Sequence, residues 1–156
     1  MSERPAWVAP WVGLPFRSRG RGPDDWDCYG LIRGAVAARC GVELPMYLDG
    51  YDRAEDSVEV ARVVAAALPD WRAVGRQDER EGDVVLLRTR DGRGAHVGLL
   101  VGDGLPGFVL EMLPRMRSVC PRREGPVMEP RILGAFRHPL LEVAWQNSLL
   151  PTPLPG

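Results

Sequence analysis

The sequence has no lysine, only two histidines and three cysteines, and no long apolar run. Cys28, Cys40 and Cys120 are an odd and sparse set, which excludes a disulfide-stapled secreted domain and favours a reduced folding compartment. No window approaches the roughly 20 apolar residues that span a bilayer. The N-terminus lacks the basic start and apolar run of a signal peptide. We therefore expect no membrane insertion and no Sec export.

Charge and ligand spacing exclude further classes. The chain carries 21 acidic and 20 basic residues, a net charge of -1, so nothing indicates a general attraction to nucleic acid or anionic lipid. No cysteine or histidine pair has the spacing of a metal site, and we expect no metal and no cofactor. With 156 residues, 45% of them hydrophobic, the chain is long enough for one soluble domain with its own core.

Two helices are predicted in the first half. The first is bounded by Asp25 or Asp27 as N-cap and by Gly41 at its end. The second begins at Asp56, which forms a capping-box pattern with Glu59, and ends at Pro69. Each has an apolar stripe at helical spacing: Cys28, Leu31, Ile32, Ala35 and Val36 in the first, and Val60, Val63, Val64, Ala67 and Leu68 in the second.

The second half changes to short apolar runs separated by Gly, Pro and Asp, which predict strands over residues 83–89, 95–102, 107–113, 116–120 and 132–137. Helices followed by a strand meander indicate an α+β domain, with the helices packed on a small antiparallel sheet or open barrel.

The expected domain covers residues 1–139, with residues 1–22 as an N-terminal strap over the core and Trp7 and Trp11 on one face of a helical turn. Residues 140–156 form a proline-rich C-terminal extension. Its apolar residues would be exposed unless something covers them, either a partner or the domain itself: Leu140, Leu141, Trp145, Leu149, Leu150 and Leu154. His138, at the end of the last strand, is predicted at the surface without a role, and Cys40 and Cys120 are expected to be buried fillers.

Cys28 is the candidate nucleophile because it lies at a predicted helix N-terminus. A thiol reacts as thiolate, and its pKa falls at a helix N-terminus beside a histidine. The alternative is an ordinary buried structural thiol.

His96 is the candidate base and Glu111 its candidate partner. His96 begins a predicted strand, and it shares a face with Gly98 and Leu100, so that small neighbours leave room for the imidazole. A two-residue turn at Asp103-Gly104 would put His96 directly opposite Glu111, and a slip of two residues would keep them on one face. Cysteine, histidine and an acidic orienter make a nucleophilic relay. The alternative for Glu111 is a solvent-facing strand residue.

Several segments in this order resemble the NlpC/P60 cysteine peptidases, specifically the branch of phage tails and gene transfer agents. The segments are WVGLPFRSRGRG, WDCYGLIRGAVAARCGVELP, EGDVVLLR, AHVGLLVGDG and ILGAFRHP, and together they cover roughly residues 11 to 139. The resemblance implies a papain-like α+β fold and hydrolysis of peptide bonds in peptidoglycan stem peptides. Partners would be tail-tip or hub proteins, and the location would be the virion tail tip after synthesis in the bacterial cytoplasm.

Within that resemblance, Cys28 matches the nucleophile, His96 the base and Glu111 the third polar residue, and Asp27 and Tyr29 flank the nucleophile. Two positions depart from the pattern. Glu111 stands where relatives usually have histidine, and Phe16 stands where many have a tyrosine whose hydroxyl supports the oxyanion. The alternatives are therefore a structural tail-tip component with a weak or inactive site, and a cellular hydrolase or acyltransferase that acts on another amide.

Overall fold

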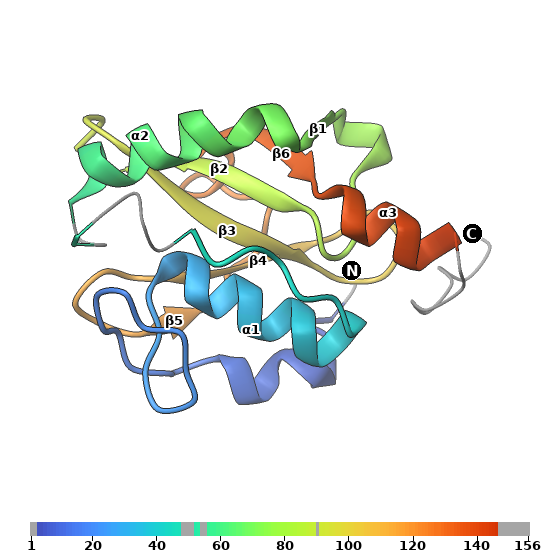
Figure 1. Ribbon diagram of the computed structural model, residues 1–156. Coiled ribbons are helices and arrows are strands. Elements are labelled where there is room, and N and C mark those ends of the chain that lie inside the picture. The colour runs from blue at the N-terminus through green and yellow to red at the C-terminus, as the bar shows by residue number, and fades with distance from the viewer. Residues whose placement is uncertain (1–2, 48–51, 54–55, 90, 147–156) are drawn as a thin grey trace.

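The computed structural model describes residues 3–47, 52–53, 56–89 and 91–146. Its centre is one six-stranded antiparallel sheet in the order β1-β6-β2-β3-β4-β5. From edge to edge the strands are β1 (Arg72–Val74), β6 (Ile132–Arg137), β2 (Val84–Arg88), β3 (Ala95–Val101), β4 (Phe108–Met112) and β5 (Ser118–Val119). β1 and β5 lie at opposite edges, so the sheet is open and not a closed barrel (Figure 1).

Three α-helices accompany the sheet: α1 (Cys28–Cys40), α2 (Ser57–Ala67) and α3 (Pro139–Gln146). Helix α1 packs on β3 and β4, and α2 packs on β3 (Figure 1). Short 3-10 helices lie at η1 (Ala6–Trp11), η3 (Leu68–Asp70), η4 (Arg76–Asp78) and η5 (Glu129–Arg131). Helices packed on an antiparallel sheet confirm the predicted α+β class.

The predicted ends of α1 are confirmed. The Asp27 side chain accepts the Gly30 N–H at 2.7 Å and so satisfies one of the donors that every helix leaves free in its first turn. At the other end Gly41 takes the left-handed conformation, with φ of 69°. Of the expected stripe, all five residues are buried: Cys28, Leu31, Ile32, Ala35 and Val36.

Helix α2 is capped as predicted, since the Asp56 carboxylate accepts the Glu59 N–H at 3.0 Å. Its apolar stripe is less covered than the periodicity suggests. Only Val60 is buried, and the rest of the stripe stays partly exposed: Val63, Val64, Ala67 and Leu68. These side chains border a pocket, described below.

The core divides into two clusters, one on each face of the sheet. The larger lies between the sheet and the helices and includes Leu31, Ile32, Leu99 and Leu110. The smaller lies on the opposite face and consists of Val74, Val85, Leu87, Leu100, Val109, Met128 and Ala135. Successive side chains of β3 and β4 therefore alternate between the two clusters.

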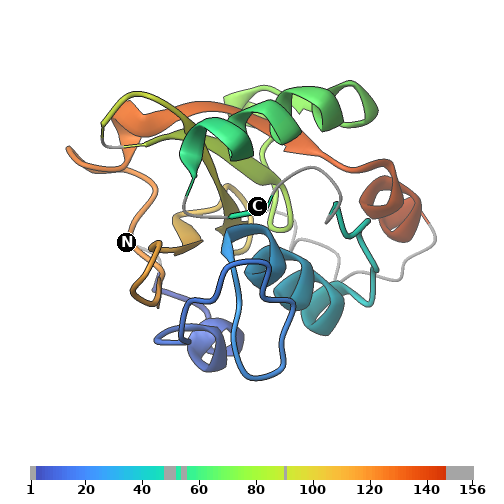
Figure 2. The same ribbon diagram turned by 60° about the vertical axis from the view of Figure 1, so that its left-hand side comes forward.

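The N-terminal segment packs on the core. Val8 is fully buried, and Trp7 and Trp11 pack against the larger cluster. The Trp7 indole N–H donates to the Glu81 carboxylate at 3.1 Å. η1 lies against α1 (Figure 2).

Two elements were not anticipated. β1 pairs with β6 at one edge of the sheet. Helix α3 follows β6 directly and puts Leu141 and Ala144 into the larger cluster, so this part of the expected extension packs on its own domain. The expectations for residues 147–156, including Leu149, Leu150 and Leu154, fall outside the described residues.

His138 was predicted at the surface, and that prediction is wrong. Its side chain is buried, with its ring edge-on to Trp71 at a centroid distance of 4.9 Å. Its Nδ1 accepts the Leu140 N–H at 3.1 Å, which helps to start α3. The imidazole is therefore part of the packing between α3 and the residues before β1.

Candidate active site

Cys28 is the first residue of α1, so its backbone N–H lies in the turn that has no intrahelical acceptor. The preceding Asp27 is fully buried. Its Oδ1 accepts from the Gly30 N–H, and also from Arg21 Nη1 at 2.7 Å. A charged cap buried against the helix start fixes the direction of α1 and thereby the place of the thiol.

Gly30 explains the spacing Asp-Cys-x-Gly. A Cβ at this position would lie 2.0 Å from the Gly20 carbonyl oxygen and 3.1 Å from Asp27 Oδ1. The same Gly20 oxygen accepts the Asp27 N–H at 3.1 Å. Glycine is required here because the loop before α1 packs directly against the helix backbone and leaves no room for a Cβ.

The Cys28 thiol is held in its neutral form. Burial raises its pKa to about 12, and the neighbouring Asp27 carboxylate adds to the increase. The Tyr29 N–H, the Arg21 guanidinium and the Val97 N–H lower the pKa, but they do not offset burial. The helix N-terminus alone therefore does not produce a thiolate in this resting arrangement.

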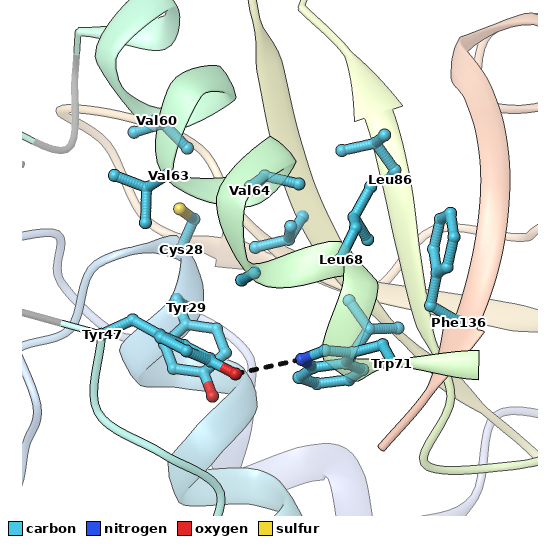
Figure 3. Close-up of a pocket in the computed structure, with 13 residues that line it drawn as sticks. Cys28, Tyr29, Tyr47, Val60, Val63, Val64, Leu68, Trp71, Leu86 and Phe136 are labelled. Carbon is cyan, nitrogen blue, oxygen red and sulfur yellow. Dashed lines mark hydrogen bonds between the residues drawn. The ribbon is translucent and has the colours of Figure 1, made fainter. Parts of the chain in front are cut away.

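The thiol borders a pocket between α1, α2 and the sheet. The close-up in Figure 3 places the Cys28 sulfur beside Val60 and Val63 at one end, with Trp71 and Phe136 at the other. Tyr29 and Tyr47 close one side with their rings tilted against each other at a centroid distance of 5.4 Å. The nucleophile candidate therefore faces an apolar space.

His96 and Glu111 lie close together, although not in the directly opposite register. β3 and β4 pair with Gly98 opposite Glu111. This register differs by two residues from the one that a two-residue turn at Asp103-Gly104 would give, because the connection runs from Gly102 to Gly107. The slip keeps both side chains on one face, as anticipated. His96 Nε2 lies 3.8 Å from Glu111 Oε1.

No motif in the sequence predicted the partner that holds Glu111. Arg131, the last residue of η5, donates Nη2 to Glu111 Oε1 at 3.2 Å and Nη1 to Oε2 at 3.3 Å. This two-pronged pairing satisfies a carboxylate that is only 1% exposed. Glu111 is therefore not the solvent-facing residue of the alternative interpretation.

The His96 imidazole is also held neutral. Burial lowers its pKa to about 4, and the nearby Arg131 cation lowers it further. Its Nε2 is buried without a hydrogen-bond partner among the described residues, because Glu111 is slightly too far away. A small approach of the carboxylate would supply that partner.

Cys28 and His96 reach the start of β3 from opposite faces. Val97 lines the pocket with Cys28, and its N–H donates toward the sulfur. By strand alternation His96 points to the other face, together with Glu111. The β3–β4 ladder ends at Gly98, so the edge of β3 beside Val97 is not paired with β4 and the thiol can approach it. Within the described part of the chain, no hydrogen bond joins sulfur and imidazole.

The predicted reason for Gly98 needs correction. A Cβ there would lie 2.6 Å from Val109 Cγ1 and 3.3 Å from both Leu87 and Val85 side-chain atoms. The small residue makes room for the second cluster and not for the imidazole. His96 is placed by the strand start and by Glu111 and Arg131 instead.

Comparison with known proteins identifies the family. The family model described as "NlpC/P60 family" matches residues 13–109, more than half of the chain. The chain belongs to the NlpC/P60 family. No curated protein sequence is significantly similar to it.

Solved NlpC/P60 structures share the fold. An NlpC/P60 family protein from Bacillus cereus aligns with a TM-score of 0.55 at 20% identity over 88% of this chain and 41% of that one. An NLP/P60 family protein from Staphylococcus aureus gives 0.54 at 16% identity, covering 84% and 38%. The NlpC/p60 domain of the peptidoglycan hydrolase SagA gives 0.50 at 17% identity, covering 83% and 92%. The chain thus spans about two fifths of the first two proteins.

Two further motifs of the NlpC/P60 resemblance meet in a buried ion pair. Asp83, of the Gly-Asp segment, accepts from Arg137 of the closing strand, through Nε at 2.7 Å and Nη2 at 2.8 Å. It also accepts the Arg80 N–H at 2.8 Å. Burial nevertheless raises the pKa of Asp83. These motif residues lock β6 to the start of β2 and have a structural role here.

The supporting residues Phe16 and Tyr29 lie on either side of the start of α1. Phe16 forms a parallel bridge with Trp26 and packs against the larger cluster. Tyr29 donates its hydroxyl to the Pro45 carbonyl at 2.6 Å, with the Arg21 guanidinium 5.5 Å from its ring centre. Phe16 offers no hydroxyl, so the candidate oxyanion donor at this place is the Cys28 backbone N–H at the helix start.

No group of three or more His, Cys, Asp or Glu side chains in the described residues could hold a metal ion. No helix in this part of the chain is both long and apolar enough to cross a bilayer.

Proposed function

We propose that this NlpC/P60 chain is a cysteine peptidase that hydrolyses peptide bonds of peptidoglycan stem peptides, with Cys28 as nucleophile and His96 as base. The observation that carries the proposal is the meeting of three groups at the start of β3. Cys28 lines the pocket together with Val97, His96 is the residue before Val97, and Glu111 Oε1 is 3.8 Å from His96 Nε2. One structural neighbour is named as a peptidoglycan hydrolase, which supports the choice of substrate.

The proposed reaction begins from a neutral pair. The Cys28 thiol lies at the edge of β3 beside Val97, and past that edge it gives its proton to His96 as the sulfur attacks the carbonyl carbon, because neither group is ionised in the resting site. The Cys28 N–H faces the developing oxyanion at the helix start. Glu111, held by Arg131, receives the Nε2–H of the imidazolium. The amine leaves with the proton, and water then releases the acid from the thioester.

The direct test is digestion of purified peptidoglycan with the purified chain, followed by mass spectrometry of released stem peptides. Cys28→Ala should reduce release by about 1,000-fold or more, as loss of a nucleophile does in related relays. Cys40→Ala is the matched control, because Cys40 is also a buried thiol on α1. Equal release by wild type and Cys28→Ala would refute the proposal.

A second candidate is a structural protein with the peptidase fold and little activity. It is favoured by the raised pKa of Cys28, the lowered pKa of His96 and the lack of a hydroxyl at Phe16. Under this alternative, the folded wild type and Cys28→Ala would release equally little peptide in the same digestion.

We further propose that the chain acts at a phage tail tip, held there by tail or hub proteins. The support is the resemblance over residues 11 to 139 alone. The test is truncation with two end points. Ending the chain after Gln146 should abolish incorporation into particles and leave folding intact. Ending it after Pro139 also removes Leu141 and Ala144 from the core, and should cost several kcal/mol of stability. Particles that still contain the chain truncated after Gln146 would show that residues 147–156 do not hold it at the tail tip.

A further inference from the structure

The pocket beside Cys28 has a chemistry that the proposed reaction does not require. None of its lining side chains in the described part of the chain is charged, and none is histidine, asparagine or glutamine. The partly exposed stripe of α2 forms one wall, and Leu86 and Phe136 of the sheet form another. A peptide substrate with charged side chains finds no ion-pair partner in such a space.

The two hydroxyls in the lining are already hydrogen-bonded within the protein. Tyr29 donates to the Pro45 carbonyl at 2.6 Å, and Tyr47 accepts the Trp71 indole N–H at 3.2 Å (Figure 3). The rings therefore present their carbon faces and edges to the pocket. Any bound group is held by apolar contact and by the shape of the walls.

The pocket is also long. Its α2 wall runs from Val60 to Ala67, seven steps of about 1.5 Å or about 10 Å, and Leu68 continues the wall. The methyl group of an alanine would fill only the end nearest the sulfur. The far end lies between Trp71 and Phe136 (Figure 3). A group must be an extended chain to span the distance from the sulfur to that end.

We propose that the site has a further activity, on amides or esters other than stem peptides, in which this pocket binds an acyl group that is an extended apolar chain of about four to eight carbons. The inference rests on the proposed role of Cys28 as nucleophile. The sulfur is part of the pocket lining, so the carbonyl that it attacks lies at the pocket mouth with the acyl chain inside. The acyl chain, not the amine, is then the part of the substrate that the protein recognises.

The chemistry is an ordinary acyl transfer. The Cys28 sulfur forms a bond to the carbonyl carbon, the bond from that carbon to the leaving nitrogen or oxygen breaks, and the thiol proton passes to His96 and on to the leaving group. Water then attacks the thioester, releases a carboxylic acid and restores the thiol. No oxidant or other reagent is needed.

The test uses p-nitrophenyl esters of acetate, butyrate, hexanoate and octanoate with the full chain. Release of p-nitrophenolate gives the acylation rate, and the mass of the Cys28 peptide shows the S-acyl adduct. Each buried methylene contributes about 0.8 kcal/mol, or about fourfold. Acylation relative to hydroxide hydrolysis should therefore rise at least about tenfold from acetate to hexanoate.

Val64→Phe is the variant that fills the pocket, because Val64 lines it. It should lower the ratio of the hexanoate rate to the acetate rate about tenfold. Val58→Phe is the matched control on the same helix, because Val58 is exposed and outside the lining. Equal thermal unfolding of the two variants shows that both are folded.

The outcomes separate the two proposals. Rates that do not depend on chain length, or equal effects of Val64→Phe and Val58→Phe, would overturn the acyl pocket, while peptidoglycan digestion could still succeed. Chain-length selectivity together with failed digestion would support the pocket and refute the stem-peptide substrate. If no ester acylates Cys28, the role of Cys28 fails and the pocket inference fails with it.

Discussion

The two faces of the sheet differ in their chemistry at the start of β3. On the helix side, Cys28 borders a pocket without charged walls. On the opposite side, His96 lies beside Glu111 and Arg131, a buried ion pair. Burial acts on both candidates but in opposite directions, because it penalises the charged form of each group. It raises the pKa of the thiol and lowers the pKa of the imidazole.

This difference shows that proximity alone does not make a thiolate–imidazolium pair. At neutral pH both groups are neutral in the resting site, and the Arg131 cation opposes a second positive charge on His96.

The largest expected effect comes from Arg131→Met. This change leaves Glu111 buried without its charged partner, which should lower the free energy of unfolding by about 3 to 5 kcal/mol in urea titrations. Arg72→Met, which removes an exposed pair with Glu142, should cost at most about 1 kcal/mol. The double variant Glu111→Leu/Arg131→Met should recover most of the loss. Equal costs at the two arginines would show that the pair at Glu111 is not desolvated.

The next effect is the pH dependence of stability. The pKa of His96 is lowered from 6.5 to about 4 in the folded chain, so the unfolded chain binds more protons between these values. The free energy of unfolding should therefore fall as the pH drops from 6.5 to 4, with His96 contributing roughly 3 kcal/mol.

His96→Gln should flatten the urea-derived stability profile between pH 6.5 and 4. His138 also has a lowered pKa and acts in the same direction, so His138→Gln supplies the comparison. If the His96→Gln profile keeps the full wild-type slope, His96 is not buried as a neutral imidazole.

A smaller effect is expected in thiol alkylation. At pH 8, iodoacetamide should label Cys28 at least about tenfold faster than Cys120, since both pKa values are raised to about 12 but only Cys28 borders the pocket. The rate at Cys28 should keep rising through pH 9 to 11, as a neutral thiol requires. Peptide mass mapping measures both. A plateau below pH 8 would indicate a preformed thiolate–imidazolium pair.

The smallest effect concerns the charge beside the nucleophile. The Asp27 carboxylate raises the pKa of Cys28, so Asp27→Asn should lower that pKa and speed alkylation of Cys28 by roughly threefold. Asparagine keeps an acceptor for the Gly30 N–H but removes the charge that pairs with Arg21, so thermal unfolding of the variant checks that it is folded. Asp25→Asn is the control, because Asp25 is only partly buried and pairs with Arg17 at the surface. An unchanged rate in Asp27→Asn would mean that burial alone holds the thiol neutral.

Local signals in the sequence predicted much of the fold. The caps at Asp27, Gly41 and Asp56 and the change of period after Glu81 are decided by residues a few positions apart. β1 was missed because it has three residues and gains its ladder from β6, which follows some 60 residues later. Helix α3 was missed because the prolines after it suggested an extended tail, whereas Leu141 finds a place in the core.

Local spacing encodes the family motifs, the helix start at Cys28 and the shared face of His96 and Glu111, because each depends on residues along one helix or one hairpin. The surroundings of these residues come from long-range contacts in the fold. Arg131 reaches Glu111 from another segment, and the pocket arises where α2 leaves part of its stripe uncovered. Burial and charge from distant segments set the two pKa values, and no local spacing encodes those contacts.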